Sequence, residues 1–352
     1  MSDQKIDTQR DKHNKELGVW FPAVRTGTGT DVFTERLVKD LNKQGIKAEI
    51  TWLPLRAEYS PWTVAAPKPP EWATIVHVNT WLHSRFLPKN LPLIATLHHS
   101  IHDPALRAYK GWLRAAYHRW WIAPNERRVL QRANHVTAVS QFVADMAQKT
   151  LCDVPMQVIY NGIDTNVFCP GKRVRQPGEP FRLLYIGAWR QLKGVDLLAP
   201  IMDQLGDEFE LHYTGGLAAE KDKIKMPSNM YDLGRLSGSQ VVTSMQNSDA
   251  FLFPSRSEGF GLAVAEAMAC GLPVIATRGS SLVEIVTDGE NGWLCPKDEI
   301  ASFVSAARRM LLNNESFSNM KKKAAADAQI NFNLTTTTSS YHYNYKSITG
   351  NI

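Results

Sequence analysis

The sequence predicts an α/β protein made of two doubly wound parallel-sheet domains. Short apolar segments with strand character alternate with amphipathic segments, as in a parallel sheet whose strands are connected by helices. A segment with three prolines, two glycines and three basic residues (169–180) interrupts this alternation, which then starts again. The length of 352 residues also favours two domains over one.

The first half begins with GVWFPAV, which starts at Gly18 and is the first expected strand, followed by the loop RTGTGT. DVFTERLVKDLNKQG has the pattern of a helix that Asp31 caps at its start and Gly45 at its end. Residues 46–52 alternate apolar and polar side chains as a strand does. Further strands are expected in TIVHV, PLIATL, HVTAVS and QVIY.

The second half repeats this order. Strands are expected in RLLYIG, ELHYTG, NMYDLG, DAFLFP and PVIAT, with one helix from about Val195 and another across SRSEGFGLAVAEAMACGLP. The expected organisation is a polar, disordered tail, a first domain, a linker, a second domain and a closing helix that returns to the first domain. Their ranges are 1–17, 18–168, 169–180, 181–334 and about 335–352. Ligands of such sheets bind beyond the carboxyl ends of the strands, so the site is expected in the cleft between the domains.

The composition is that of a soluble globular enzyme, with 43% hydrophobic and 21% charged residues. No apolar run approaches the roughly 20 residues that span a bilayer, and the first residues are too polar for a signal peptide. The four cysteines form no CxxC pair, which argues against a zinc site or a disulfide framework and favours a reducing, cytoplasmic setting.

The positive charge is concentrated in the first half. Residues 1–170 contain 21 Lys and Arg against 15 Asp and Glu, whereas the rest of the chain contains 19 of each. A basic half beside a neutral one suggests an anionic partner, although chance surface composition explains so mild a bias almost as well.

Two glutamates, Glu258 and Glu266, lie among small and apolar residues. Buried acids are costly unless something binds them. Glu258 is in the turn that follows a strand, and Glu266 is about one turn into the next helix, so both can face one cleft. Carboxylates accept paired hydrogen bonds from the hydroxyls of a sugar or ribose. The alternative is an ordinary helix glutamate paired with a surface lysine, which the apolar setting disfavours.

Two anion sites are expected near these acids. The helix start leaves free N–H groups at about Phe260, Gly261 and Leu262. A second loop, GAWRQLKG, brings Arg190 and Lys193 to another strand end ahead of a helix, and such an arrangement suits a diphosphate. The sequence contains no Asp-x-Asp pair, so stabilisation of a departing nucleoside diphosphate is expected to need no metal.

EGFGLAVAEAMACGLPVIAT resembles the Glu-x7-Glu signature of the GT4 family of retaining glycosyltransferases, which have the GT-B fold of two Rossmann-like domains facing across a cleft. VIYNGIDTNVF is similar to the family's hinge-proximal segment, and ERRVLQRANHVTAVS to its helix and strand ending in Ser140. LYIGAWRQLKG resembles the phosphate-binding loop, SLVEIVTDGENGWL a downstream element, and TLHH a Thr-x-His motif at the cleft edge. The resemblance covers most of the chain.

The resemblance implies roles for individual residues. Glu266 would bind the donor's ribose hydroxyls, and Glu258 would face the transferred sugar. The turn residues between them would contact the sugar hydroxyls and the phosphates; they are Phe260, Gly261 and Leu262.

The other implied site residues lie in three loops. Arg190 and Lys193, in the loop that starts at Gly187, would hold the diphosphate, and His98 would lie beside the reacting sugar. The loop with Gly27 and Gly29 would border the phosphate and the acceptor. Two departures stand out: Ala188 replaces the arginine that often follows the glycine matched by Gly187, and TGTGT replaces the usual Gly-Gly.

The function that the resemblance implies is metal-independent, retaining transfer of a sugar, without a cofactor, to a hydroxyl of a glycan or lipid-linked acceptor. UDP-sugars are favoured over GDP-sugars as donors, and cell-surface polysaccharide or lipopolysaccharide biosynthesis as the setting. Two alternatives stay open, a nucleotide-sugar epimerase of GT-B fold and a non-catalytic subunit that binds a nucleotide or glycan. Nucleic-acid binding has little support, because no such motif occurs.

The segment RAYKGWLRAAYHRWW, through Trp121, has the pattern of an amphipathic helix. Its apolar face would contain Tyr109, Trp112, Leu113, Ala116, Tyr117, Trp120 and Trp121. The other face would carry Arg107, Lys110, Arg114, His118 and Arg119. Such a helix suits an anionic membrane surface on the cytoplasmic side, but a core-packed helix with a solvated basic face gives the same pattern and is slightly favoured.

Overall fold

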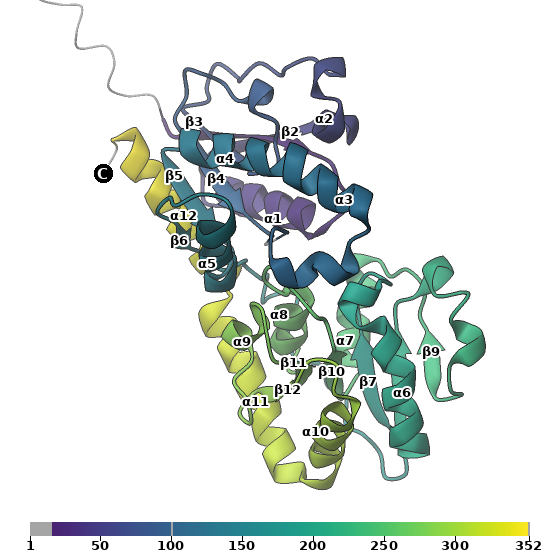
Figure 1. Cartoon of the computed structure of the whole chain (residues 1–352). Coiled ribbons are helices and arrows are strands. Elements are labelled where there is room, and N and C mark those ends of the chain that lie inside the picture. The colour runs from purple at the N-terminus through teal and green to yellow at the C-terminus, as the bar shows by residue number, and fades with distance from the viewer. Residues whose placement is uncertain (1–15, 100, 351–352) are drawn as a thin grey trace, which may run out of the picture.

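The computed structural model describes residues 16–99 and 101–350 and contains two six-stranded parallel sheets (Figure 1). The spatial order of the strands is β2-β1-β3-β4-β5-β6 in one sheet and β12-β11-β10-β7-β8-β9 in the other. Helices connect most of the successive parallel strands, as predicted, whereas 3₁₀ segments connect β3 to β4 and β8 to β9. The prediction of two doubly wound domains is therefore confirmed. Most of the tail expected over 1–17 lies outside the described residues.

The first sheet is built by the early part of the chain. Its strands are β1 (Gly18–Val24), β2 (Lys47–Leu53), β3 (Ile75–Asn79), β4 (Leu93–Leu97), β5 (His135–Ala138) and β6 (Gln157–Val158). Its α-helices are α1 (Gly29–Lys43), α2 (Arg56–Tyr59), α3 (Trp112–Tyr117), α4 (Ala123–Arg132) and α5 (Gln141–Thr150). The strands are apolar on both faces because helices cover the sheet on each side.

The second sheet follows residues 169–180, which contain no helix or strand. Its strands are β7 (Phe181–Tyr185), β8 (Phe209–Tyr213), β9 (Met230–Asp232), β10 (Ala250–Phe253), β11 (Val274–Thr277) and β12 (Gly292–Cys295). The helices are α6 (Val195–Leu205), α7 (Gly238–Gln246), α8 (Leu262–Ala269), α9 (Leu282–Ile285), α10 (Ile300–Leu312) and α11 (Asn314–Asn331).

The last helix, α12 (Leu334–Thr349), leaves the second domain and packs on the first (Figure 1). Its Tyr341 and Tyr345 are fully buried, and the Tyr345 hydroxyl lies 2.7 Å from Nδ1 of His77 in β3. The closing segment is therefore anchored in the core of the first domain despite its poor helix formers. Residues 351–352 of the expected closing helix lie outside the described part.

The strand orders define one switch point in each sheet. In the second sheet, β7 lies between β8 and β10, so the loops after β7 and β10 diverge there. In the first sheet, β1 lies between β2 and β3, and the loops after β1 and β3 diverge. Ligands of doubly wound sheets bind at such points, beyond the carboxyl ends of the strands.

Two details of the sequence interpretation are wrong. Thr28, not Asp31, precedes the first turn of α1; the Asp31 carboxylate accepts hydrogen bonds from the N–H groups of Thr26 (2.9 Å) and Gly27 (2.7 Å) and so braces the preceding loop.

The expected helix over Tyr109–Trp121 is not one regular helix. Tyr109 ends a 3₁₀ segment (Pro104–Tyr109), α3 starts at Trp112, and a π-helical turn (His118–Ile122) joins α3 to α4. The proposed basic face is broken as well, because His118 is buried.

Candidate active site

A lysine and a glutamate meet at the switch point of the second sheet. Lys193 is at the end of the loop after β7, and Glu258 is in the turn after β10; Nζ of Lys193 lies 2.6 Å from Oε1 of Glu258. The hydroxyl of Ser255 donates a second hydrogen bond to the same oxygen (2.7 Å). The two loops predicted to hold a diphosphate and a sugar therefore share one small region.

Arg256 braces these two loops, a role that the sequence did not reveal. Its guanidinium bonds to both carboxylate oxygens of Asp196 (2.7 and 2.8 Å) and to Asp298 (2.6 Å). Its backbone N–H donates to the carbonyl of Leu192 (2.9 Å). These bonds fix the Lys193 loop against the Glu258 turn. An arginine just after a strand was the only signal in the sequence.

The start of α8 lies beside this pair. The helix begins at Leu262, with Gly261 in the preceding position, so its first N–H groups have no partners within the helix. The side chain of Phe260 is buried against Tyr160, so only its backbone can contact a ligand. The hydroxyl of Ser281 holds the turn by donating to the carbonyls of Glu258 (3.1 Å) and Phe260 (2.8 Å).

Glu266 is only 9% exposed and is bound by an arginine of the other domain. Nη2 of Arg36, from α1, lies 2.6 Å from Oε1 of Glu266. Burial raises the pKa of Glu266, and the charge and hydrogen bond of Arg36 oppose that rise. Nη1 of Arg36 is buried without a hydrogen-bond partner in the described part of the protein. Nothing in the sequence singled out Arg36.

His98 reaches the junction from the first domain. It is buried, its Nε2 lies 2.8 Å from Oδ1 of Asn79 at the end of β3, and its ring packs edge-on against Phe33. Burial holds the pKa of His98 well below its ordinary value, so the imidazole is neutral near pH 7. The Gly259 backbone is so close that a Cβ there would lie 2.0 Å from the His98 carbonyl oxygen. The two domains are thus in backbone contact at this point.

His99, next in the chain, is a second histidine of the junction. It belongs to the TLHH motif, but the sequence did not predict it as a site residue. Its side chain is solvent-accessible, yet the surrounding protein lowers its pKa to about 4, first by desolvation and then through the charge of Lys193. A neutral imidazole close to Lys193 and Glu258 can donate or accept one hydrogen bond to a ligand.

The other predicted residues are spread around this centre. A Cβ on Gly29, the first residue of α1, would lie 3.3 Å from Cδ1 of Leu262, so the starts of α1 and α8 face each other. Gly27 is exposed in the preceding loop. The N–H of Gly187 donates to Thr214 within its own domain (3.1 Å). The Arg190 side chain is exposed, and it forms no hydrogen bond or ion pair with the other described residues.

Two further contacts join the domains. The hydroxyl of Ser140, which caps α5, donates to the carbonyl of Gly259 (2.6 Å). The carboxylate of Glu284 accepts the N–H groups of Gln141 and Phe142 at the start of α5, both at 2.8 Å. Within residues 16–99 and 101–350, no group of three or more His, Cys, Asp or Glu side chains is arranged to hold a metal ion.

The two doubly wound domains, with Lys193, Glu258 and Glu266 at their junction, fit the resemblance to the GT4 family that the sequence indicates. The family model "Glycosyl transferases group 1" matches residues 172–327, and "Glycosyltransferase Family 4" matches residues 52–167. The chain belongs to the GT4-type glycosyltransferases.

Individual relatives agree with this family. An uncharacterized glycosyltransferase of Methanocaldococcus jannaschii is 30% identical over 229 residues, 64% of this chain and 60% of that protein. A D-inositol 3-phosphate glycosyltransferase of Acidothermus cellulolyticus is 25% identical over 283 residues, 70% of this chain and 61% of that protein. The alignments thus span about 60% of the length of these relatives.

Solved structures establish the fold independently. A sucrose-phosphate synthase from Thermosynechococcus elongatus matches with a TM-score of 0.79 and 17% identity, over 95% of this chain and 100% of that one. The Anabaena protein HepE in complex with UDP and glucose matches with a TM-score of 0.71 and 17% identity, over 94% and 100% of the two chains. The GT-B fold predicted from the sequence is confirmed.

Proposed function

We propose that this protein transfers a sugar from a nucleotide diphosphate sugar to an acceptor hydroxyl with retention of the anomeric configuration. The observation that carries the proposal is the contact between Lys193 and Glu258 at the switch point of the second sheet. A cation near a helix start suits a diphosphate, and an acid beside it suits the hydroxyls of the attached sugar. Membership of a glycosyltransferase family supports the same reaction.

In the proposed mechanism, the bond between the sugar and the diphosphate breaks, and the sugar develops oxocarbenium character. Lys193 and the N–H groups at the start of α8 stabilise the charge on the departing diphosphate, which is the largest kind of catalytic contribution in many enzymes. The acceptor hydroxyl attacks the face that the diphosphate leaves, and its proton passes to an oxygen of the departing diphosphate. We propose that no metal ion and no cofactor take part.

Glu266 would hold the ribose of the donor. Its hydrogen bond from Arg36 uses Oε1, which leaves Oε2 for the ribose hydroxyls. Glu258 would bind hydroxyls of the transferred sugar, and neutral His98 would lie beside that sugar on the side of the first domain. Arg190 would turn towards the diphosphate only when a donor is bound, since it has no partner among the described side chains.

The donor class that we propose is a UDP-sugar, and the acceptor a glycan or a lipid-linked hydroxyl used in building a cell-surface polysaccharide or lipopolysaccharide. HepE, which shares the fold, was solved in complex with UDP and glucose, and this supports a uridine donor. The cysteines of the described chain are free thiols, and such thiols suit a cytoplasmic reaction.

A panel of UDP- and GDP-sugars, screened by thermal unfolding, tests the proposed function. A UDP-sugar is expected to raise the Tm, because a ligand that binds only the folded state stabilises it. Turnover with the best donor should require an acceptor, survive EDTA and give a product with the donor's anomeric configuration, as read by NMR. The proposal is wrong if no nucleotide sugar shifts the Tm.

The same assay separates two other activities. An epimerase of this fold would convert the nucleotide sugar without an acceptor. A non-catalytic subunit would show a thermal shift but neither donor consumption nor product.

A further inference from the structure

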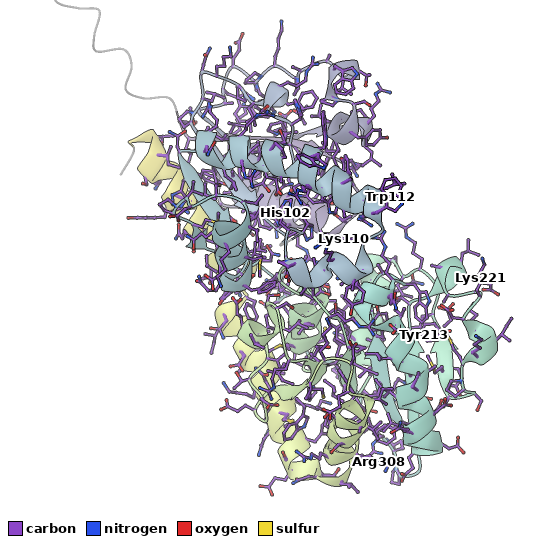
Figure 2. The ribbon with its side chains drawn as sticks, viewed as in Figure 1. His102, Lys110, Trp112, Tyr213, Lys221 and Arg308 are labelled. Atoms are coloured by element: carbon purple, nitrogen blue, oxygen red, sulfur yellow. The ribbon has the colours of Figure 1, made fainter. Side chains whose placement is uncertain are left out.

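Large apolar side chains of α3 and the following π-helical turn face solvent. Trp112 is 78% exposed, Leu113 67% and Trp120 73%. Figure 2 shows Trp112 at the outer edge of the molecule, on the first-domain side of the boundary between the domains. The core-packed alternative therefore fails for these three residues, whereas Tyr117 and Trp121 are partly buried.

A second segment contributes to the same surface. Leu55 is 50% exposed, Tyr59 52% and Trp62 64%. The ring of Trp62 packs edge-on against Trp121 at 5.9 Å. The indole N–H of Trp121 also donates to the carbonyl of Glu58 in α2 (2.9 Å). We call residues 54–63 and 104–122 together the aromatic surface.

The aromatic surface is strongly basic. Its exposed basic residues are Arg56, Arg107, Arg114 and Arg119. Lys110 is partly buried, and its ammonium group donates to the carbonyl of Ile101. The two segments contain one acid, Glu58, and burial raises the pKa of that carboxyl. Arg119 lies over the ring of Trp120 at 5.2 Å. Exposed tryptophans next to arginines match the interface of an anionic bilayer, where indoles enter the headgroup region and guanidinium groups meet phosphates.

We propose that the aromatic surface docks the protein on an anionic lipid bilayer. A second copy of this chain is a poorer occupant, because a symmetric contact would bring like charges together. The surface supplies attachment from outside the bilayer: no helix in the described part of the chain combines the length and hydrophobicity needed to cross one.

The docked surface lies next to the proposed site. Tyr109, in the same segment, has its ring 5.5 Å from Cζ of Arg256 and 5.2 Å from Nζ of Lys297 in the second domain. Arg256 is the residue that braces the Lys193 loop. A bilayer under the aromatic surface would thus present a lipid-linked hydroxyl close to the junction. Docking itself does not depend on sugar transfer.

Vesicle flotation tests the docking. The full chain is expected to float with vesicles of phosphatidylcholine and phosphatidylglycerol, to stay behind with phosphatidylcholine alone, and to be released by high salt, which screens the exposed arginines. The double variant Trp112→Ser/Trp120→Ser should lose about tenfold or more of the bound fraction, since each tryptophan supplies buried apolar area at the interface. Arg114→Gln/Arg119→Gln should also lower the fraction of protein that floats with the anionic vesicles, because fewer guanidinium groups meet the lipid phosphates.

Matched controls lie in the second domain. Leu312→Ser removes a side chain that is 81% exposed, and Arg308→Gln removes an exposed arginine at the far end of the molecule (Figure 2). Both should float like the unchanged protein. Calorimetry with UDP should give the same affinity for all variants. Loss of UDP binding would argue against the proposed function, and it is measured separately from loss of vesicle binding. The docking proposal is overturned if all variants float equally or if none floats at all. It is also overturned if the unchanged protein is a dimer that does not float and that the tryptophan substitutions dissociate.

Discussion

The two domains share one architecture but use the corresponding edges of their sheets differently. At the switch point of the second domain, charged side chains meet: Lys193 pairs with Glu258, and Arg256 braces both loops. At the edge of the first domain the corresponding groups are histidines, His98 and His99, whose pKa values are lowered by desolvation. The charged side chain that the first domain brings to the junction is Arg36, which binds Glu266 of the other domain.

Under the proposed function, this difference would give the two domains complementary tasks. A diphosphate needs cations and free N–H groups at its binding site, and the second domain provides them. A neutral sugar and its acceptor hydroxyl need hydrogen-bonding groups without net charge, which neutral histidines provide. A substitution in one domain should therefore impair the task of that domain and leave the task of the other domain intact.

Lys193→Ala should have the largest effect. Loss of a cation that stabilises the departing diphosphate is expected to lower kcat by ~10²–10³-fold, about 2.7–4 kcal/mol. Turnover of the best donor measures it. Lys221→Ala, an exposed lysine of the same domain (Figure 2), is the matched control and should retain full activity. Near-normal turnover of Lys193→Ala would mean that the diphosphate binds elsewhere.

Arg36→Met should have the next largest effect, this time on stability. The change leaves Glu266 buried without its partner, and an unpaired buried charge costs about 3 kcal/mol. Urea unfolding measures the loss. The double variant Arg36→Met/Glu266→Gln should regain most of it and yet bind UDP more weakly in calorimetry. If the single variant is as stable as the unchanged protein, the link between the domains does not depend on this ion pair.

The sequence predicted the fold well because buried parallel strands are short and apolar. GVWFPAV coincides with β1, and DAFLFP brackets β10 within one residue at its start and its end. Such strands lie between helices, so their boundaries follow hydrophobicity alone. Lys193 and Glu258 could be predicted as site residues for the same reason, because both lie in loops that follow recognisable strands.

The rest depends on tertiary packing that periodicity does not encode. Arg36 lies in an amphipathic helix, where its spacing is that of a solvated residue, and only the approach of α8 makes it a partner of Glu266. The aromatic pattern of residues 109–121 fitted both a core helix, which was slightly favoured, and a surface helix. Which tryptophans face solvent was decided by the packing of Trp121 on α2 and by the π-helical turn.

Acidification should destabilise the first domain through His77. Burial lowers the pKa of His77 to about 3, below the ordinary value of 6.5, so the unfolded chain binds the proton more readily. The free energy of unfolding should therefore fall by about 2 kcal/mol between pH 7 and pH 5 from this residue alone. His77→Asn should reduce the pH dependence by that amount. Tyr345→Phe, which removes a hydrogen bond to the ring but keeps the imidazole, should lower stability without flattening the profile.

Ser140→Ala should have the smallest effect, and it tests how the neutral and charged edges are held together. The hydroxyl accepts the N–H of Val143 at the start of α5 and donates to the carbonyl of Gly259 in the other domain. Loss of a helix cap costs about 1 kcal/mol. Urea unfolding should show this loss. Ser140→Thr retains the hydroxyl and should recover most of the stability. Because Gly259 is adjacent to Glu258, Ser140→Ala should also raise the KM for the donor while leaving kcat nearly unchanged. A change in kcat alone would mean that the contact acts on the chemistry and not on domain closure.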